Sequence, residues 1–361
     1  MQNAVPRAFV ITLLCSTLML TVWSLQPTPW RVAKSAAVFG VITVTTANDF
    51  YGEDGHCSLR EAILAANTNV QVYECLGAQA GLDTIQFNLG AGTPVINITQ
   101  AALPSITEPL VIDGATGGAT RVELNGLGAG PDASGLVVDG GGTTIKSLVI
   151  NRFETFGIYL RSDGNVVQDC YIGTDAAGMT ALGNLVGGIV VELADGNTIG
   201  GTNAGQGNVI SGNGDNGITL SGSTNSLVQG NFIGTNAAGT ALGNGQNGVR
   251  LDSIDAASTG NIIGGTAVGA GNTIAFNTDN GVCLYSNPTL NNRILSNLIF
   301  SNGLLGIDLV SDGRSNGQVT ANDAADPDNG PNKLQNFPVL TSISAAGTIS
   351  GSLDSTTDNS A

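Results

Sequence analysis

Short runs of alternating apolar and polar residues recur along most of the chain and predict strands rather than helices. The unit is a glycine followed by an apolar residue, any residue and a second apolar residue. Seven copies follow one another at similar spacings: Gly135-Leu-Val-Val, Gly157-Ile-Tyr-Leu, Gly188-Ile-Val-Val, Gly217-Ile-Thr-Leu, Gly248-Val-Arg-Leu, Gly281-Val-Cys-Leu and Gly306-Ile-Asp-Leu. Such a period predicts a repeat protein in which each unit buries its apolar face on the next.

Two longer segments are duplicated at about twice that spacing. Tyr171-Ile-Gly-Thr-Asp-Ala-Ala-Gly matches Phe232-Ile-Gly-Thr-Asn-Ala-Ala-Gly, and Asn197-Thr-Ile-Gly-Gly-Thr matches Asn261-Ile-Ile-Gly-Gly-Thr. We interpret the duplicated loops as shared structure, because a single active site does not need two copies.

A second strand follows in each unit and often begins with asparagine. Its asparagines are Asn208, Asn231, Asn272 and Asn297, each two residues before an isoleucine. Stacked at the strand spacing of ~4.8 Å, these side chains would lie over one another. Their amides are then expected to hydrogen-bond along a ladder.

This combination resembles the right-handed parallel β-helix proteins of the pectate-lyase-like superfamily, over about residues 84–320. The resemblance implies an all-β fold, a single-stranded right-handed parallel β-helix solenoid. A β-propeller needs four strands per ~40–45 residues and a leucine-rich repeat needs leucine every few positions, so neither fits. No lyase motif matches, and the resemblance transfers no catalytic residue.

The segment before the solenoid differs in pattern. Residues 41–46 alternate and predict a strand. Ser58 and Glu61 form a capping-box pattern, which predicts a helix with Leu59, Ile63 and Leu64 on its buried side.

The string Cys57-Ser-Leu-Arg-Glu-Ala resembles a motif in the N-terminal domain of bacterial exported β-helix proteins. The resemblance implies that residues 41–80 form a small α/β cap on the first coil. A solenoid end exposes apolar core and an unpaired strand edge, so a cap is physically required.

The N-terminus predicts export. Arg7 precedes an uncharged run over residues 8–25, and small residues follow up to Ala37. We expect residues 1–37 to be a signal peptide, with an uncleaved N-terminal anchor as the alternative. No other run is long enough to span a membrane. The expected location is therefore secreted or on the bacterial cell surface.

Cysteine usage agrees with that compartment. Cys57 and Cys75 both fall in the small expected cap, and we expect them to form a disulfide. Cys170 and Cys283 fall in different registers of the repeat and are not paired.

Composition excludes several functions. Lys and Arg number 12 against 28 Asp and Glu, a net charge of −16, so nucleic-acid binding is not expected. The single histidine, His56, would have to serve any histidine-based metal site or catalytic triad. We expect a monomer whose partners are polysaccharides or other cell-surface components.

Candidate chemistry lies on the outward positions of the repeated strands. Because successive side chains of a strand point to opposite faces, two columns of side chains in the repeated strands are expected to face away from the core. They are Val137, Tyr159, Val190, Thr219, Arg250, Cys283 and Asp308, and then Asp139, Arg161, Glu192, Ser221, Asp252, Tyr285 and Val310. A saccharide groove would use Tyr159, Arg161, Glu192, Arg250, Asp252 and Tyr285.

Catalysis is a second interpretation of these columns. A hydrolase would pair Glu192 with Asp252, or Asp252 with Asp308, near the ~6.5–9.5 Å of inverting enzymes. A lyase would need a basic residue such as Arg250 and Ca²⁺ on carboxylates. The plainest interpretation is a solvated salt ladder that relieves like-charge stacking.

The repeat fades after Leu309. Residues 321–361 read as an acidic turn and the start of an incomplete β domain, so the chain is a candidate fragment. Asp323, Asp326 and Asp328 offer hard oxygen ligands that suit Ca²⁺, although the fixed pattern of an EF-hand is lacking. No other cofactor is expected.

Three functions follow from this sequence. The leading hypothesis is a secreted or surface module without chemistry that binds glycans or surfaces. The others are a polysaccharide lyase or glycoside hydrolase of the pectate-lyase-like type, and a structural stalk.

Overall fold

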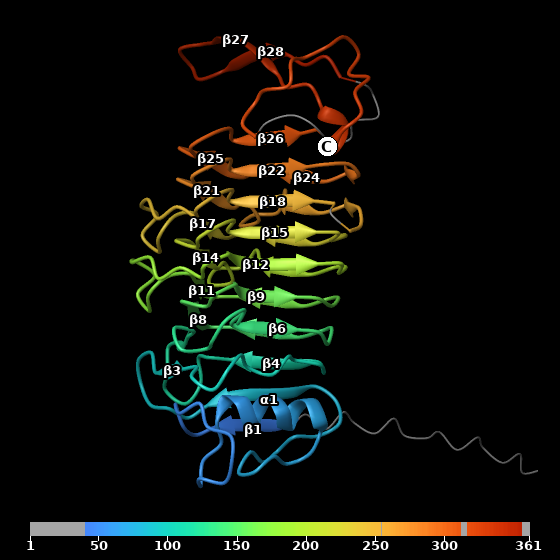
Figure 1. Ribbon diagram of the computed structural model, residues 1–361. Helices are drawn as coiled ribbons and strands as arrows, with labels where there is room; N and C mark the ends of the chain where they lie inside the picture. Colours follow the sequence, from blue (N-terminus) through green and yellow to red (C-terminus); the bar gives the residue numbers. More distant parts are fainter. Residues whose placement is uncertain (1–39, 254, 312–315, 356–361) are drawn as a thin grey trace, which may run out of the picture. The chain divides into compact units, whose positions relative to one another are not determined.

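The structure is a computed structural model that describes residues 40–253, 255–311 and 316–355. The predicted signal peptide, residues 1–37, lies outside the described residues. Within them, strands pair in parallel with strands one coil further along the chain and form three long sheets (Figure 1).

Each long sheet takes its strands in chain order. The nine-stranded sheet contains β1 (Val41–Val44), β2 (Asp83–Phe87), β4 (Leu110–Asp113), β7 (Thr144–Lys146), β10 (Val166–Gln168), β13 (Thr198–Gly200), β16 (Leu227–Gln229), β20 (Ile262–Gly264) and β24 (Arg293–Leu295). The eight-stranded sheet contains β3 (Val95–Asn97), β5 (Val122–Asn125), β8 (Leu148–Asn151), β11 (Tyr171–Ile172), β14 (Val209–Ile210), β17 (Phe232–Ile233), β21 (Thr273–Ala275) and β25 (Leu298–Phe300).

The seven-stranded sheet contains β6 (Leu136–Val138), β9 (Phe156–Leu160), β12 (Gly187–Glu192), β15 (Ile218–Ser221), β18 (Val249–Asp252), β22 (Val282–Tyr285) and β26 (Ile307–Val310). These strands are the seven repeated Gly-apolar-x-apolar units, in order. The predicted fold class, an all-β parallel β-helix, is therefore confirmed. The right-handed winding is the one that parallel crossover connections adopt.

The core is a set of aliphatic columns inside the coils. One column in the eight-stranded sheet runs in register through Ile96, Leu124, Ile150, Ile172, Ile210, Ile233 and Ile274. All of these side chains are buried. Burying one such side chain contributes roughly 1.5–3 kcal/mol, so the stack supplies much of the stability that a single coil lacks.

The N-terminal helix forms as predicted. Helix α1 (Leu59–Thr68) has a complete capping box: the Ser58 hydroxyl accepts from the Glu61 N–H, and Glu61 accepts from the Ser58 N–H. Leu59 and Ile63 are buried, but Leu64 is only half-buried. The prediction for Leu64 was wrong because Ala62, Ala65 and Ala66 complete the buried side instead.

The other residues of the Cys57–Ala62 motif tie the helix to its neighbours. Cys57 forms the predicted disulfide with Cys75, across a Cα–Cα distance of 4.8 Å. Arg60 lies 2.8 Å from Asp49, and Asp49 also accepts the N–H groups of Thr99 and Gln100. Burial raises the pKa of Asp49, but these hydrogen bonds outweigh it and hold the pKa below its ordinary value.

The strand of the expected cap, β1, pairs in parallel with β2, so it is also the first strand of the solenoid's nine-stranded sheet. Cys170 and Cys283 are unpaired, as expected, and both are buried, Cys283 even though it was predicted to face outward. Beyond β26, the short helix η1 (Pro331–Leu334) precedes an antiparallel hairpin, β27 (Val339–Ile343) with β28 (Ile349–Ser352). A small parallel pair joins β19 (Ser258–Thr259) to β23 (Thr289–Leu290).

The predicted asparagine ladder forms at a corner of the coils. The side-chain amide of each of Asn208, Asn231 and Asn272 donates to the carbonyl oxygen of the next ladder member, ending at Asn297, over 2.8–3.0 Å. The same oxygen accepts the backbone N–H of the preceding asparagine. Each ladder step therefore satisfies two buried donors with one side chain.

Further asparagine ladders were not predicted. One runs through Asn184, Asn213, Asn244, Asn277 and Asn302. A second runs through Asn216, Asn247, Asn280 and Asn316, and a third, interrupted one joins Asn165 to Asn197 and Asn261 to Asn292 and Asn332.

No helix among the described residues has the length and apolar content needed to cross a membrane.

Substitution inside the predicted ladder tests its contribution. Asn231→Ala removes an acceptor from two buried donors of Asn208, and each orphaned group costs about 1–3 kcal/mol. We expect a loss of about 3 kcal/mol in the free energy of unfolding by urea. Asn203→Ala, at an exposed asparagine outside the ladders, is the control and should cost clearly less. Equal losses in the two variants would show that the ladder adds nothing beyond local packing.

Candidate functional site

The outer face of the seven-stranded sheet carries the residues predicted to bind or react. Register places Tyr159, Val190, Thr219 and Arg250 in one column, one coil apart. The next column contains Glu192, Ser221 and Asp252. Both columns have the register expected from the repeat, because the aliphatic residues between them are fixed in the core.

The first cluster joins three coils. The Arg161 guanidinium makes two hydrogen bonds to the Asp139 carboxylate, at 2.8 and 2.9 Å. It lies 5.3 Å from the centre of the Tyr159 ring, and the Tyr159 hydroxyl donates to Glu192. The charges therefore alternate along the column and are internally paired.

The environment of this cluster changes two pKa values. Burial, together with the hydrogen bond to Glu192, raises the pKa of Tyr159 to about 12. The Asp139 carboxylate raises the pKa of Arg161. Both shifts keep the groups in the protonation states that maintain the hydrogen bonds.

The second cluster is centred on Arg250. Its Nε atom lies 3.1 Å from the Asp252 carboxylate, and its guanidinium lies 4.6 Å from the centre of the Tyr285 ring. Asp252 is 2% exposed, and its second oxygen has no hydrogen-bond partner among the described residues. Arg250 therefore spans two coils and holds one carboxylate and one aromatic ring together.

Asp308 lies apart from Asp252. It is in the column of Arg250, two coils further on, whereas Asp252 belongs to the neighbouring column. Its carboxylate is buried and accepts from the Gly317 N–H at 2.6 Å. Burial raises its pKa despite this hydrogen bond. The two carboxylates are thus offset along the strand as well as along the stack.

Glu192 and Asp252 do share a column, with Ser221 between them. Two coils correspond to roughly 10 Å, slightly more than the ~6.5–9.5 Å between the carboxylates of inverting glycosidases. Each is also engaged, Glu192 by Tyr159 and Asp252 by Arg250. The face therefore offers paired charges to a ligand rather than a free acid and a free base.

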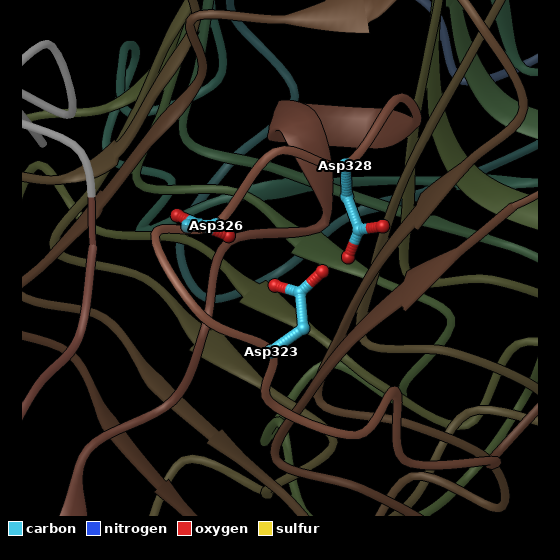
Figure 2. A group of neighbouring side chains, drawn as sticks. All are labelled: Asp323, Asp326 and Asp328. Carbon is cyan, nitrogen blue, oxygen red and sulfur yellow. The ribbon is translucent and has the colours of Figure 1, made fainter.

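The acidic turn brings its three predicted residues together. Carboxylate oxygens of Asp323, Asp326 and Asp328 lie within 4.8 Å of one another, and Figure 2 shows the carboxyl groups of Asp323 and Asp328 pointing toward each other. Desolvation and the charges of the two neighbours raise the pKa of Asp323. Asp326 accepts from the Asn336 N–H and the Ser355 hydroxyl.

A groove of about 600 Å³ over the eight-stranded sheet was not predicted. Its lining includes Tyr171 and Phe232, which occupy the same place in the duplicated segments, together with Arg121 and Asp169. The duplication itself was the signal, because aromatic residues at matching outward positions of two coils must face the same way.

No family model matches the chain, and no curated protein matches it. Among solved structures, the chain is similar to a mutant of the periplasmic alginate epimerase AlgG, with 14% identity, 64% of this chain and 59% of the epimerase covered, and a TM-score of 0.40. It is also similar to the pectate lyase Pel9A, with 13% identity, 70% and 69% coverage and a TM-score of 0.32. The first match therefore spans 59% of the epimerase's length. At these values neither similarity carries an activity or a residue role to this chain.

The raised pKa of Tyr159 predicts a loss of stability at alkaline pH. Because the folded pKa is above the ordinary value of 10, the stability contributed by the neutral phenol is complete below pH 10 and is lost as the pH rises through about 12. Absorbance titration in the near ultraviolet should show a late-ionising component that is lost in Tyr159→Phe. Glu192→Gln should shift the ionisation of Tyr159 to lower pH. Glu108 is a remote, exposed carboxyl, and Glu108→Gln should leave this ionisation unchanged. An unchanged titration in Glu192→Gln would contradict the hydrogen bond.

Calcium binding at the acidic turn remains a prediction. Three clustered carboxylates suit a hard cation. Millimolar CaCl₂ should raise the melting temperature of the wild-type protein, and Asp328→Asn should remove the increase. Asp132→Asn, an exposed acid elsewhere, is the control. An equal calcium effect in both variants would indicate general screening of negative charge.

Proposed function

We propose that this chain is an exported module that binds glycans through the outer face of the seven-stranded sheet, without chemistry of its own. The supporting observation is the pair of arginine–tyrosine stacks, Arg161 with Tyr159 and Arg250 with Tyr285, each braced by a carboxylate. Aromatic ring faces and planar charged groups are the side chains that meet a sugar's C–H face and its hydroxyl groups.

The spacing of the two stacks supports an extended ligand. Tyr159 and Arg250 lie in one column with Val190 and Thr219 between them, so roughly 14 Å separates them along the stack. The two intervening side chains carry no charge; Val190 is buried and Thr219 is half-buried. A chain of several sugars would contact both stacks.

The pairing of the charges favours binding over catalysis. A general acid or base must change its protonation state during turnover, and an ion pair or hydrogen bond opposes that change. Asp139, Glu192 and Asp252 each have such a partner. Export is supported by the disulfide, which persists in oxidising compartments.

A polysaccharide panel tests the proposal. Neutral and acidic polymers would be assayed for binding by affinity electrophoresis, and for turnover by absorbance of unsaturated products and by reducing ends, with and without Ca²⁺. We expect binding without product, weakened about tenfold or more in Tyr285→Ala. Phe300→Ala is the matched control, because both rings are 38% exposed and Phe300 lies on another sheet.

Other results would separate the alternatives. Product that disappears in Arg250→Ala would establish a lyase or hydrolase. Absence of binding to every polymer, with an unchanged circular dichroism spectrum, would favour a structural stalk.

A further inference from the structure

We infer that the groove over β11, β14 and β17 is a second glycan-binding site, which takes a neutral chain of pyranose sugars. It lies on a different sheet from the arginine–tyrosine stacks and does not depend on them. Its floor is the outward column Tyr171, Val209 and Phe232, in register over three successive coils. Tyr171 and Phe232 are therefore two coils, or roughly 10 Å, apart.

The walls are made by the duplicated loops packed on each other. On one side, the Ala237 N–H donates to the Gly178 carbonyl at 2.9 Å. A Cβ on Gly178 would lie 2.8 Å from the Tyr171 ring and 2.9 Å from Ala237, so the loop can approach the ring only with glycine there. On the other side, a Cβ on Gly269 would lie 2.2 Å from the Thr202 carbonyl oxygen. Close backbone packing thus fixes both walls before any ligand binds.

Polar groups in the groove are also fixed. The Arg121 guanidinium lies 3.9 Å from the centre of the Tyr171 ring and forms an ion pair with Asp169. Arg121 Nε donates to the Asp169 carbonyl at 3.1 Å, and the Ser147 hydroxyl donates to the Asp169 carboxylate at 2.7 Å. The Phe232 ring remains 40% exposed. The groove therefore presents a free ring next to a preorganised set of hydrogen-bonding groups.

The chemistry of the groove selects its ligand class. A peptide cannot add as a strand, because β14 is already paired with β11 on one side and β17 on the other. A polyanion is disfavoured by the net charge of −16, and Arg121 is neutralised by Asp169. An aromatic ring beside fixed donors and acceptors, without net charge, suits the C–H face and hydroxyl groups of an uncharged sugar.

The test uses the whole exported protein with neutral hexasaccharides, namely cellohexaose, mannohexaose and xylohexaose, and with hexagalacturonate as the charged comparison. Affinities would be measured by isothermal titration calorimetry. We expect at least one neutral hexasaccharide to bind more tightly than hexagalacturonate, and Phe232→Ala to weaken it about tenfold or more. Leu298→Ala is the matched control, since Leu298 is 60% exposed in the same outward column, two coils beyond Phe232.

Variants on the two sheets separate the two proposals. If Phe232→Ala weakens binding and Tyr285→Ala does not, the groove binds glycans independently. If only Tyr285→Ala weakens binding, the groove is not a glycan site and the proposed function stands. Equal losses in Phe232→Ala and Leu298→Ala would also overturn the groove. Failure of every hexasaccharide to bind the folded wild-type protein overturns both proposals.

Discussion

The stacking of coils at the strand spacing is the constraint on which the rest of this structure depends. Every coil must turn three corners, and the backbone groups at a buried corner need partners that a short unit cannot supply from its own residues. Asparagine solves this problem because its side chain carries both a donor and an acceptor. In each ladder the acceptor of one coil satisfies the amide and the backbone N–H of its neighbour, as Asn231 does for Asn208. Of the 35 asparagines in the sequence, 18 belong to these ladders, so about half of the asparagine content follows from this geometry.

Once the corners are fixed, the outward side chains have little freedom in their placement. Ile189 and Val191 are held in the core, so Val190 and Glu192 must face outward at one-coil spacing from their counterparts. This is why the register of Tyr159, Arg250 and Asp252 could be predicted from the repeated unit alone. The same reasoning predicted the ladder at Asn208 and the helix at Ser58, because each depends on a local pattern with a single geometric solution.

The pairing of side chains could not be predicted from register. Arg250 reaches Asp252 along its own strand and Tyr285 one coil away, a choice among rotamers that the pattern leaves open. The additional ladders were not predicted because their asparagines lie outside the strands, although Asn216, Asn247 and Asn280 each directly precede a repeated glycine. The groove was missed for a related reason. Its floor follows from the repeat, but its walls are loops whose close packing depends on glycines such as Gly178 and Gly269.

The duplicated segments show how such a fold can repeat the same outward side chains in successive coils. Repeating a loop in two coils gives both copies the same outward direction, so any aromatic residue they share becomes a row of rings, as with Tyr171 and Phe232. A row of equivalent contacts suits a polymer whose own units repeat, and affinity then grows with the number of units engaged. Catalysis does not benefit from equivalent contacts in the same way. It needs one residue whose pKa differs from the pKa values of the residues at the same position in other coils. In this chain Asp139, Glu192 and Asp252 on the outer face are each held by a neighbouring side chain, which opposes a change in protonation state. We base the proposal of recognition over turnover on this pairing.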